Sequence, residues 1–252
     1  MRGIRHPSPE SRRRASRQTP RRGGVDASAP ADMLAAMNPR TVLPLSVLLA
    51  AVALNAAEAP KITAFERSQG WQLLFDGRDL SSWRGYRSDK VPANWRVADG
   101  SLTGAAGAAL VTAAEFGDFE LTFDWRVGEG GHGEVFVRTS EDAASPDRSG
   151  PQMQLAGHGP ALGGHGLAAP ERTIPPQFGV WYRSKIVAFG NRVEHWINGE
   201  RVHAYSVDTP EWRKLVAASP LAGARDLGRQ RAGFIALSGD RVEFRNLKVR
   251  PL

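Results

Sequence analysis

The chain of 252 residues contains no cysteine. This absence excludes disulfide bonds and any catalysis by a thiolate, so a buried core must provide the stability. Roughly 190 residues follow the first sixty, and a domain of that size buries about 70% of the surface that its unfolded chain exposes. We therefore expect a domain that is stable without covalent cross-links.

The sequence near the N-terminus also lacks an apolar run long enough for a comfortable membrane span. The run from Thr41 to Leu54 has 14 residues, whereas a spanning helix needs about 20. It follows Met37 and Arg40 and is succeeded by small residues, which is the layout of a secretory signal peptide. We predict a signal peptide at 37–59 and, before it, a disordered basic segment or a misassigned start at 1–36. A single membrane anchor and a disordered basic arm are the alternatives.

Basic charge is scarce outside this leader. Residues 1–59 hold nine arginines and four acids, and therefore carry +5 of the formal net charge of +7. The remaining domain is close to neutral, so it has no basic surface of the kind that nucleic acids bind. We predict a periplasmic or secreted protein, with no nucleic-acid partner and no stable membrane span after processing.

The domain at 60–252 has an alternating pattern of apolar and polar residues. From Phe119 to Val127 every odd position is apolar and every even position is polar. Strict alternation over nine residues indicates a strand with one buried and one solvated face. Turn dipeptides that supply positive φ separate similar runs: Asp99-Gly100, Gly190-Asn191, Asn198-Gly199 and Gly239-Asp240.

The pattern predicts an all-β protein, a two-sheet antiparallel β-sandwich with one short helix. The helix is expected at Pro210 to Ala218, capped by Thr209 or Asp208. Eleven strands are expected, in the order of the chain: 71–75, 95–97, 101–104, 119–127, 134–138, 153–155, 182–189, 192–197, 201–205, 232–237 and 242–249.

A long irregular segment, 156–179, interrupts the strands, and loops of this length are usually functional or mobile. It contains His158 and His165, and His132 precedes it. Their spacing matches no standard zinc pattern, so we predict no metal site and no cofactor, with binding of a metal by this loose cluster as the alternative. The glycine-rich stretch at 128–133 is a turn, because neither Lys-Ser/Thr nor a helix follows it.

Several segments resemble one known family in order and in sequence. They are GWQLLFDGRDLSSWRGY, NWRVADGSLTG, LVTAAEFGDFELTFDWRV, GEVFVRTS, GPQMQL, WYRSKIVAFGNRVEHWING, TPEWRKLVAAS and GFIALSGDRVEFRNLKVR. Over residues 65–250 the chain is similar to the 3-keto-disaccharide hydrolase family. The resemblance implies a concanavalin A-like jelly-roll sandwich and a small-molecule or oligosaccharide substrate.

The resemblance also implies a chemistry. A ketone at C3 of a sugar acidifies the proton at C2, so a base can form an enolate and the glycosidic oxygen at C1 can leave. Addition of water then completes a hydrolysis, and a sugar 3-dehydrogenase is expected to supply the ketone. Such a site needs a base and an enolate stabiliser rather than the carboxylate pair of ordinary glycosidases. A non-catalytic carbohydrate-binding module, or a structural or partner-binding protein, are the alternatives.

Strand faces suggest the catalytic residues. If the polar faces of neighbouring strands form one concave surface, Asp124, Glu134, Arg138, Gln152 and Gln154 line it together. Asp124 or Glu134 would be the base, and Arg138 the partner of the enolate oxygen. The two glutamines would bind substrate. The alternative is that the acids and Arg138 form ordinary cross-strand ion pairs on a solvated face.

Four further residues are candidates for substrate binding. His195 lies between two apolar neighbours that share its strand face, and Trp196 lies on the more polar face. Trp181 and Trp196 offer rings that a sugar can stack on, and His165 lies in the long loop. For His195, Trp181 and Trp196 the alternative is packing in the core. For His165 it is exposure to solvent.

Three positions depart from the family pattern. Gln152 replaces the glutamate of the usual G-P-E-M-Q segment, while Val180 and Tyr182 replace the glutamate and asparagine of the usual G-E-W-N segment. An amide has no acid or base role, so the substitution at Gln152 removes one titrating group. The sequence therefore predicts an altered substrate, or lost activity, if the family's chemistry uses that glutamate.

Overall fold

A computed structural model describes residues 61–156 and 164–252. The predicted signal peptide, the question of the true start and His158 lie outside these residues. The described chain is dominated by antiparallel strands, with the following bounds: β1 Gln72–Leu73, β2 Trp83–Gly85, β3 Trp95–Ala98, β4 Ser101–Gly104, β5 Leu110–Thr112, β6 Phe119–Thr139, β7 Gln152–Ala156, β8 Tyr182–Phe189, β9 Arg192–Ile197, β10 Glu200–Ser206 and β11 Phe234–Pro251.

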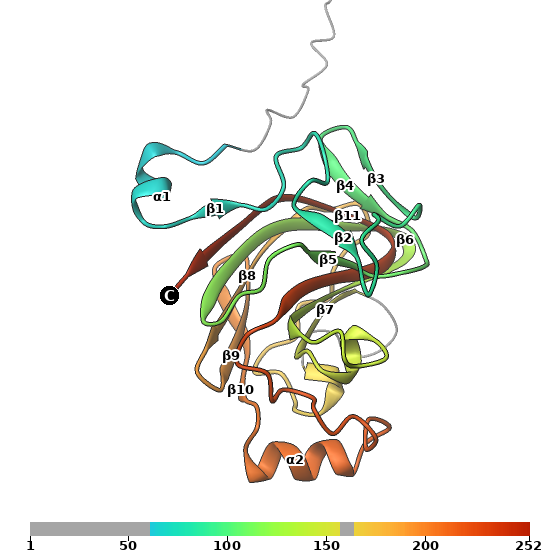
Figure 1. Ribbon diagram of the computed structural model, residues 1–252, viewed down its shortest axis with the longest axis vertical. Coiled ribbons are helices and arrows are strands. Elements are labelled where there is room, and N and C mark those ends of the chain that lie inside the picture. The colour runs from blue at the N-terminus through green and yellow to red at the C-terminus, as the bar shows by residue number, and fades with distance from the viewer. Residues whose placement is uncertain (1–60, 157–163) are drawn as a thin grey trace, which may run out of the picture. The chain divides into compact units, whose positions relative to one another are not determined.

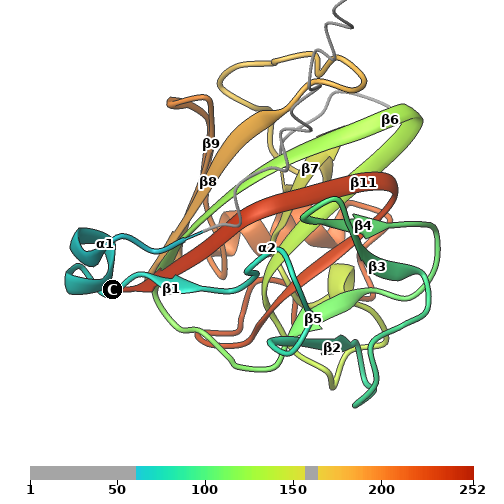
Figure 2. The same ribbon diagram turned by 90° about the horizontal axis from the view of Figure 1, so that it is seen from above.

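Two long strands, β6 and β11, pair along almost their whole length and belong to both layers of the fold (Figure 1). In the first layer, β8, β9 and β10 continue from the N-terminal part of β6, and β1, β4 and β3 extend the sheet beyond β11. In the second layer, β7 pairs with the C-terminal part of β6, while β5 and β2 follow the N-terminal part of β11. Figure 2 shows β8 and β9 beyond β6, and β4 and β3 beyond β11.

Glycines allow the long strands to bend between the layers. Gly133 of β6 is paired with Gly239 of β11, where the register of the two strands shifts nearby. A Cβ atom on Gly239 would lie 2.4 Å from the carbonyl oxygen of His132, and one on Gly133 would lie 2.8 Å from Val242. No side chain fits at either position, so the two backbones approach each other closely at the bend.

One hydrophobic core fills the space between the layers. Alternate residues of the first part of β6, including Leu121, Phe123 and Trp125, join Val135 and Val137 of its second part in this core. Trp125 stacks on Tyr182 at 5.0 Å between ring centroids, and its indole nitrogen donates to Ser184 Oγ at 2.8 Å. The alternation predicted for 119–127 therefore exists, and the predicted all-β, two-sheet antiparallel sandwich of concanavalin A-like type is confirmed.

The boundaries of several predicted strands are wrong for physical reasons. The predicted pairs 119–127 with 134–138, and 232–237 with 242–249, are single bent strands, because glycines carry the chain through the bends without breaking the pairing. β2 and β5 were not predicted, because three residues each give no measurable period. The turns predicted at Asp99-Gly100, Gly190-Asn191 and Asn198-Gly199 separate strands, and each contains a residue with positive φ. The turns predicted at Gly239-Asp240 and at 128–133 are wrong, because both stretches lie inside the long strands β11 and β6.

Two α-helices are present among the described residues, so the prediction of one helix is incomplete. Helix α2, Pro210–Ala217, is the predicted one, and Thr209 caps it by accepting a bond from Trp212 N at 3.0 Å. Helix α1, Ala64–Ser68, begins with a capping box between Thr63 and Glu66. This T-x-x-E signature is visible in the sequence. No helix in the described parts of the chain has both the length and the apolar character needed to cross a bilayer.

Candidate functional site

Polar side chains meet on the outer face of the second layer. Glu134 of β6 is paired with Gln154 of β7 on one side and with Ser238 of β11 on the other. Phe136 is paired with Gln152 in the same way. Residues paired across antiparallel strands share a face, so these five side chains point away from the core together. We call this surface, defined by Glu134, Phe136, Gln152, Gln154 and Ser238, the Glu134 face.

A short hydrogen bond fixes the carboxylate of Glu134. The hydroxyl of Ser238 donates to Glu134 Oε2 at 2.6 Å, and both residues are partly accessible to solvent. The bond leaves Oε1 without a partner in the described part of the chain, so this oxygen can accept a proton or a hydroxyl. Sequence reasoning missed Ser238, although the alternation of the last strands would have placed it on the same face.

The face is hollowed next to Phe136. Tyr86, Phe136, Asp147 and Ser238 are among the residues that line a hollow of about 370 Å³. The hydroxyl of Tyr86 donates toward the carbonyl oxygen of Ser140 at 2.6 Å. Burial raises the pKa of Tyr86 to about 12, so its hydroxyl stays neutral. An aromatic floor with polar groups at its edge is a common architecture for a sugar site.

His165 borders the face on the other side of Phe136. Its ring lies 6.2 Å from the ring of Phe136, centroid to centroid, and its Nε2 is 3.0 Å from the carbonyl oxygen of Gly150. Because a carbonyl only accepts, Nε2 carries the proton and Nδ1 of the neutral ring is an acceptor. Burial lowers the pKa of His165, which keeps the ring neutral near pH 7. His165, which the sequence predicts to bind substrate, therefore lies next to the Glu134 face.

Gln152 and Gln154 bring amides to the same surface. Both side chains are partly accessible, and neither has a hydrogen-bond partner within residues 61–156 and 164–252. Each amide offers two donors and an oxygen acceptor. The pair can therefore bind the hydroxyl or keto oxygens of a sugar.

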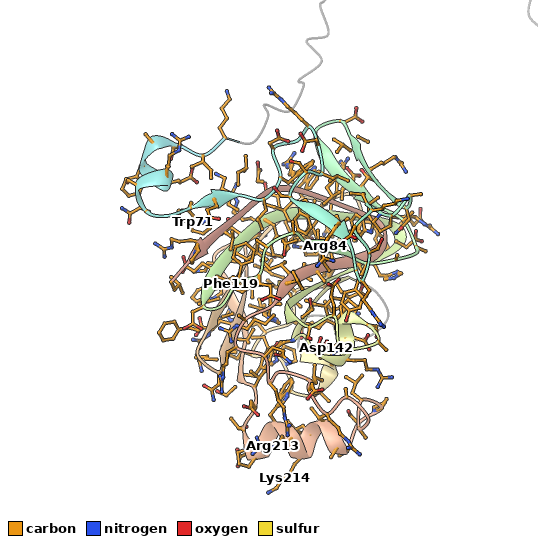
Figure 3. All side chains as sticks on the ribbon, viewed as in Figure 1. Trp71, Arg84, Phe119, Asp142, Arg213 and Lys214 are labelled. Atoms are coloured by element: carbon orange, nitrogen blue, oxygen red, sulfur yellow. The ribbon has the colours of Figure 1, made fainter. Side chains whose placement is uncertain are left out.

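A charged pair lies at the start of the loop that lines the hollow. Arg84 of β2 makes two hydrogen bonds to Glu141, at 2.6 and 2.8 Å, and its guanidinium lies 4.7 Å from the centroid of the Phe234 ring. Figure 3 labels Arg84 on β2 and Asp142 in the loop that follows β6. A bidentate pair of this kind fixes the loop at 140–148 over the outer face.

Comparisons with known proteins agree with the fold and the order of the segments. Residues 70–250 match the family described as the 3-keto-alpha-glucoside-1,2-lyase-like domain. The chain belongs to this family. A relative from Bacteroides thetaiotaomicron named 3-keto-disaccharide hydrolase is 29% identical over 247 residues, which cover 79% of this chain and 84% of the relative.

Two crystal structures from Parabacteroides distasonis, both described as candidate glycosyl hydrolases, have the same fold as the lyase-like domain. The first has a TM-score of 0.71 at 24% identity, and the match covers 77% of this chain and 99% of that one. The second has a TM-score of 0.54 at 22% identity and covers 72% of this chain and 99% of that one. The predicted family resemblance is thereby confirmed.

In this member of the lyase-like family, Asp124 lies away from the Glu134 face. It projects from the first part of β6, and the core separates the outer face of the first layer from that of the second. Asp124 Oδ1 accepts from Arg183 Nε at 3.0 Å, and Oδ2 accepts from Asn246 Nδ2 at 2.6 Å. The expectation that Asp124 and Glu134 line one surface is wrong, because the bend of β6 carries them to opposite sides of the sandwich.

Arg138 also leaves the Glu134 face. A register shift lies between β6 and β11 at this point, and Arg138 has a φ of 52°, so the alternation that would place it beside Phe136 is broken. Its guanidinium is buried and donates to Gly117 O, Gly190 O and Asp118 Oδ1. The geometric expectation for Arg138 is wrong, and the catalytic roles assigned to Asp124 and Arg138 stay predictions.

The remaining candidates lie elsewhere in the domain. His195 is fully buried, and its Nε2 is 3.4 Å from the hydroxyl of Tyr205. It therefore packs in the core, which was the alternative to substrate binding. Trp181 and Trp196 lie on the outer side of the first layer. The guanidinium of Arg245 is 3.9 Å from the centroid of Trp181, and the Nζ of Lys185 is 4.5 Å from that of Trp196. The rings predicted to bind sugar are therefore partly covered by cations.

The histidines do not form a metal site in the described structure. Within residues 61–156 and 164–252, no group of three or more histidine, cysteine, aspartate or glutamate side chains is placed to hold an ion. His132 and His165 are the described members of the loose cluster. The third, His158, lies outside the described residues.

Proposed function

We propose that this protein cleaves glycosides whose C3 hydroxyl has been oxidised to a ketone, and that the Glu134 face carries out the reaction. The observation that carries the proposal is the placement of Glu134, Gln152 and Gln154 on one outer face together with Phe136. The neutral ring of His165 lies beside Phe136, which with Ser238 lines the adjacent hollow. Membership of the lyase-like family supports it, as does the relative named 3-keto-disaccharide hydrolase.

In the proposed reaction Glu134 is the base. Its carboxylate removes the proton from C2, and the electron pair of the C2–H bond forms the enolate with oxygen at C3. The C1–O bond then breaks with formation of a C1–C2 double bond, and the leaving oxygen takes up a proton. Water adds to C1 and a proton returns to C2, so the net reaction is hydrolysis. The bond from Ser238 keeps the carboxylate of Glu134 oriented toward the substrate.

The amides of Gln152 and Gln154 are the proposed stabilisers of the enolate. An amide NH₂ donates hydrogen bonds, whereas the carboxylate that the family usually has at 152 does not. Donors aimed at the oxygen on which charge develops lower the barrier most. His165 is proposed to accept a bond from a sugar hydroxyl through Nδ1. The substitution at 152 would thus remove a titrating group and supply a donor.

A comparison of oxidised and unoxidised substrates tests this activity. The purified protein is incubated with a 3-keto-disaccharide and with its unoxidised parent, and the released sugar is measured. We expect release from the keto form alone, and a decrease in turnover of about 100-fold in Glu134→Gln. Trp196→Phe, on the other layer, is the matched control and should retain full turnover. Equal cleavage of both substrates would reject elimination as the mechanism.

A non-catalytic carbohydrate-binding module on the same fold is the second candidate. The amide at Gln152, where the family usually has a carboxylate, favours it. Saturable binding of the keto sugar without any release would support the module. If the protein neither binds nor cleaves the keto sugar, the Glu134 face has no role with saccharides.

We further propose that the protein is exported to the periplasm or secreted, and that an enzyme oxidising sugars at C3 supplies its substrate. The support is the basic n-region, the apolar run and the small residues of 37–59. Fractionation of the producing cell, with mass spectrometry of the N-terminus, tests export. A protein that begins near residue 60 in the exported fraction is expected, and an unprocessed cytosolic chain would contradict the proposal.

A further inference from the structure

A second polar hollow lies on the outer face of the first layer, away from the Glu134 face. It measures about 400 Å³ and is lined by side chains of β6, β8 and β11, by Glu66 of α1 and by Trp71. Figure 3 labels Trp71 next to β1, apart from Arg84 of the other layer. Neither the reaction proposed above nor the core uses this hollow, which we call the Asp124 pocket.

An irregularity in β11 builds the floor of the Asp124 pocket. Between Arg245 and Lys248 the register with β6 shifts, and one extra residue is inserted on the β11 side. Asn246 takes up the shift with a φ of 54°. As a result, both Arg245 and Asn246 lie against the carboxylate of Asp124, at 3.6 and 2.6 Å. Bulges are common beside functional sites, where they re-aim a side chain in this way.

The polar groups around the pocket have hydrogen-bonding capacity left. Asp124 is 5% exposed, and each of its oxygens retains a lone pair after accepting one bond, from Arg183 or from Asn246. The side chain of Arg183 is 74% exposed, and only its Nε donates to the carboxylate. Lys248 donates to Glu66 at 2.7 Å, which leaves two of its three donors for other partners.

The arrangement matches a sugar more closely than an ion. Among the lining side chains two acids, Asp124 and Glu66, stand against Arg183 and Lys248, and Arg245 adds one positive charge beside Asp124. Donors and acceptors therefore both face the pocket, and vicinal hydroxyl groups can use both. Trp71 supplies an aromatic wall, with the guanidinium of Arg250 5.4 Å from its ring centroid. The apolar face of a pyranose can stack on the ring face that Arg250 does not cover.

We propose that the Asp124 pocket is a second saccharide site, which holds one uncharged pyranose ring without cleaving it. Asp124 accepts hydrogen bonds from neighbouring hydroxyls of the sugar, Asn246 donates to them, and Trp71 stacks on the ring. The site would anchor the protein to glycan while the Glu134 face acts elsewhere on the same or another chain. It does not depend on the proposed reaction, since binding requires no ketone.

The test uses the indole N–H signals in a ¹H–¹⁵N spectrum of the protein. The chain has seven tryptophans, and Trp71→Ala identifies the signal of Trp71 by its loss. The probes are glucose, maltose and cellobiose, all unoxidised. We expect the Trp71 signal to shift with at least one probe at ~10 mM, a concentration that suits a Kd of about 1 mM.

Two variants locate the binding. Asn246→Gly keeps the left-handed backbone while removing the amide, and Thr122→Val keeps the shape while removing a hydroxyl from the pocket wall. Loss of one hydrogen bond should weaken binding by about 3- to 10-fold in Asn246→Gly. Phe189→Ala, also on the first layer but outside the pocket, should leave binding unchanged.

The outcomes separate this site from the proposed reaction. Weakened sugar binding in Asn246→Gly with unchanged turnover of the 3-keto substrate supports a second site. No shift of Trp71 with any probe, or binding that Asn246→Gly and Thr122→Val leave unaltered, would overturn it. If these variants weaken sugar binding but the wild-type protein does not cleave the 3-keto substrate, the proposed reaction is rejected and the second saccharide site is retained.

Discussion

At Arg138 the guanidinium binds two backbone carbonyls and Asp118, and its side chain is 2% exposed. These contacts join the second layer to the start of β6 and to the β8–β9 turn. Positive φ at a non-glycine residue is uncommon, and the segment GEVFVRTS contains no sequence signal for it. The role of Arg138 could therefore not be predicted from strand alternation.

The contacts of Arg138 predict a loss of stability in Arg138→Met. Removing the buried guanidinium should lower the free energy of unfolding by about 2–3 kcal/mol, because two carbonyls and the half-buried Asp118 lose their donor. Urea unfolding measures the change. Arg183→Met is the control, since its exposed pair should contribute at most about 1 kcal/mol. Similar small losses in both variants would contradict the structural role of Arg138.

His203 is a buried histidine whose ring nitrogens have no hydrogen-bond partner among the described residues. Its ring lies 5.9 Å from His195 and 4.9 Å from Tyr205. Burial lowers its pKa below the ordinary 6.5, although Glu171 opposes the shift. As the pH falls through 6.5, His203 is protonated in the unfolded chain but stays neutral in the folded chain, so the free energy of unfolding decreases.

This linkage predicts how stability responds to acid. Between about pH 7.5 and about pH 5.5, the urea midpoint of the wild-type protein should fall, and that of His203→Leu should fall less. His165 also has a lowered pKa, so some dependence should persist in the variant. An equal fall in both proteins would show that His203 is not buried in its neutral form.

At the scale of elements, the cap of α2 offers a direct test. Thr209 accepts a bond from Trp212 N at 3.0 Å, and Trp212 stacks on Tyr205 at 5.4 Å. Thr209→Ala should therefore lower the free energy of unfolding by about 1 kcal/mol. Thr209→Ser keeps the acceptor and should change it little. Thermal or urea unfolding of the three proteins checks the order, and equal stability of Thr209→Ala and wild type would contradict the capping.

Strands, turns and helices could be predicted from the sequence where neighbouring residues alone determine them. The nine-residue alternation of β6, the Asn198-Gly199 turn and the Thr209 cap each depend on neighbouring residues alone. The bends at Gly133 and Gly239 depend on a partner strand roughly a hundred residues away. Local patterning therefore gave most strand segments correctly, but it divided β6 and β11 into two strands each and missed β2 and β5. Helix α1 was missed although its capping box was present in the sequence.

At the scale of the whole molecule, the bends decide which candidate residues meet. Gln152, Gln154 and Glu134 are neighbours because β7 pairs with the second part of β6. Asp124 is on the same strand as Glu134 and yet belongs to a different surface. A sequence pattern assigns each residue to a face of its strand, but only the path of the strand assigns that face to a side of the sandwich.

The two outer faces have different chemical characters. The Glu134 face has a carboxylate, an aromatic floor and two amides that have no hydrogen-bond partner among the described residues. The outer face of the first layer instead has ion pairs and tryptophans that are partly covered by cations. This contrast supports a division into a reacting surface and a binding surface on opposite sides of one domain. Variants on one face should therefore leave the other function unaltered.

Exchange of the C2 proton is the measurement that tests the central claim most directly. A 3-keto-disaccharide is incubated in D₂O, and deuterium at C2 of the released keto sugar is quantified after subtraction of the reaction without protein. We predict that deuterium enters C2 with the wild-type protein and with Trp196→Phe, and that release and incorporation both fall by about 100-fold in Glu134→Gln. Release of sugar without deuterium at C2, or full activity in Glu134→Gln, would contradict the account.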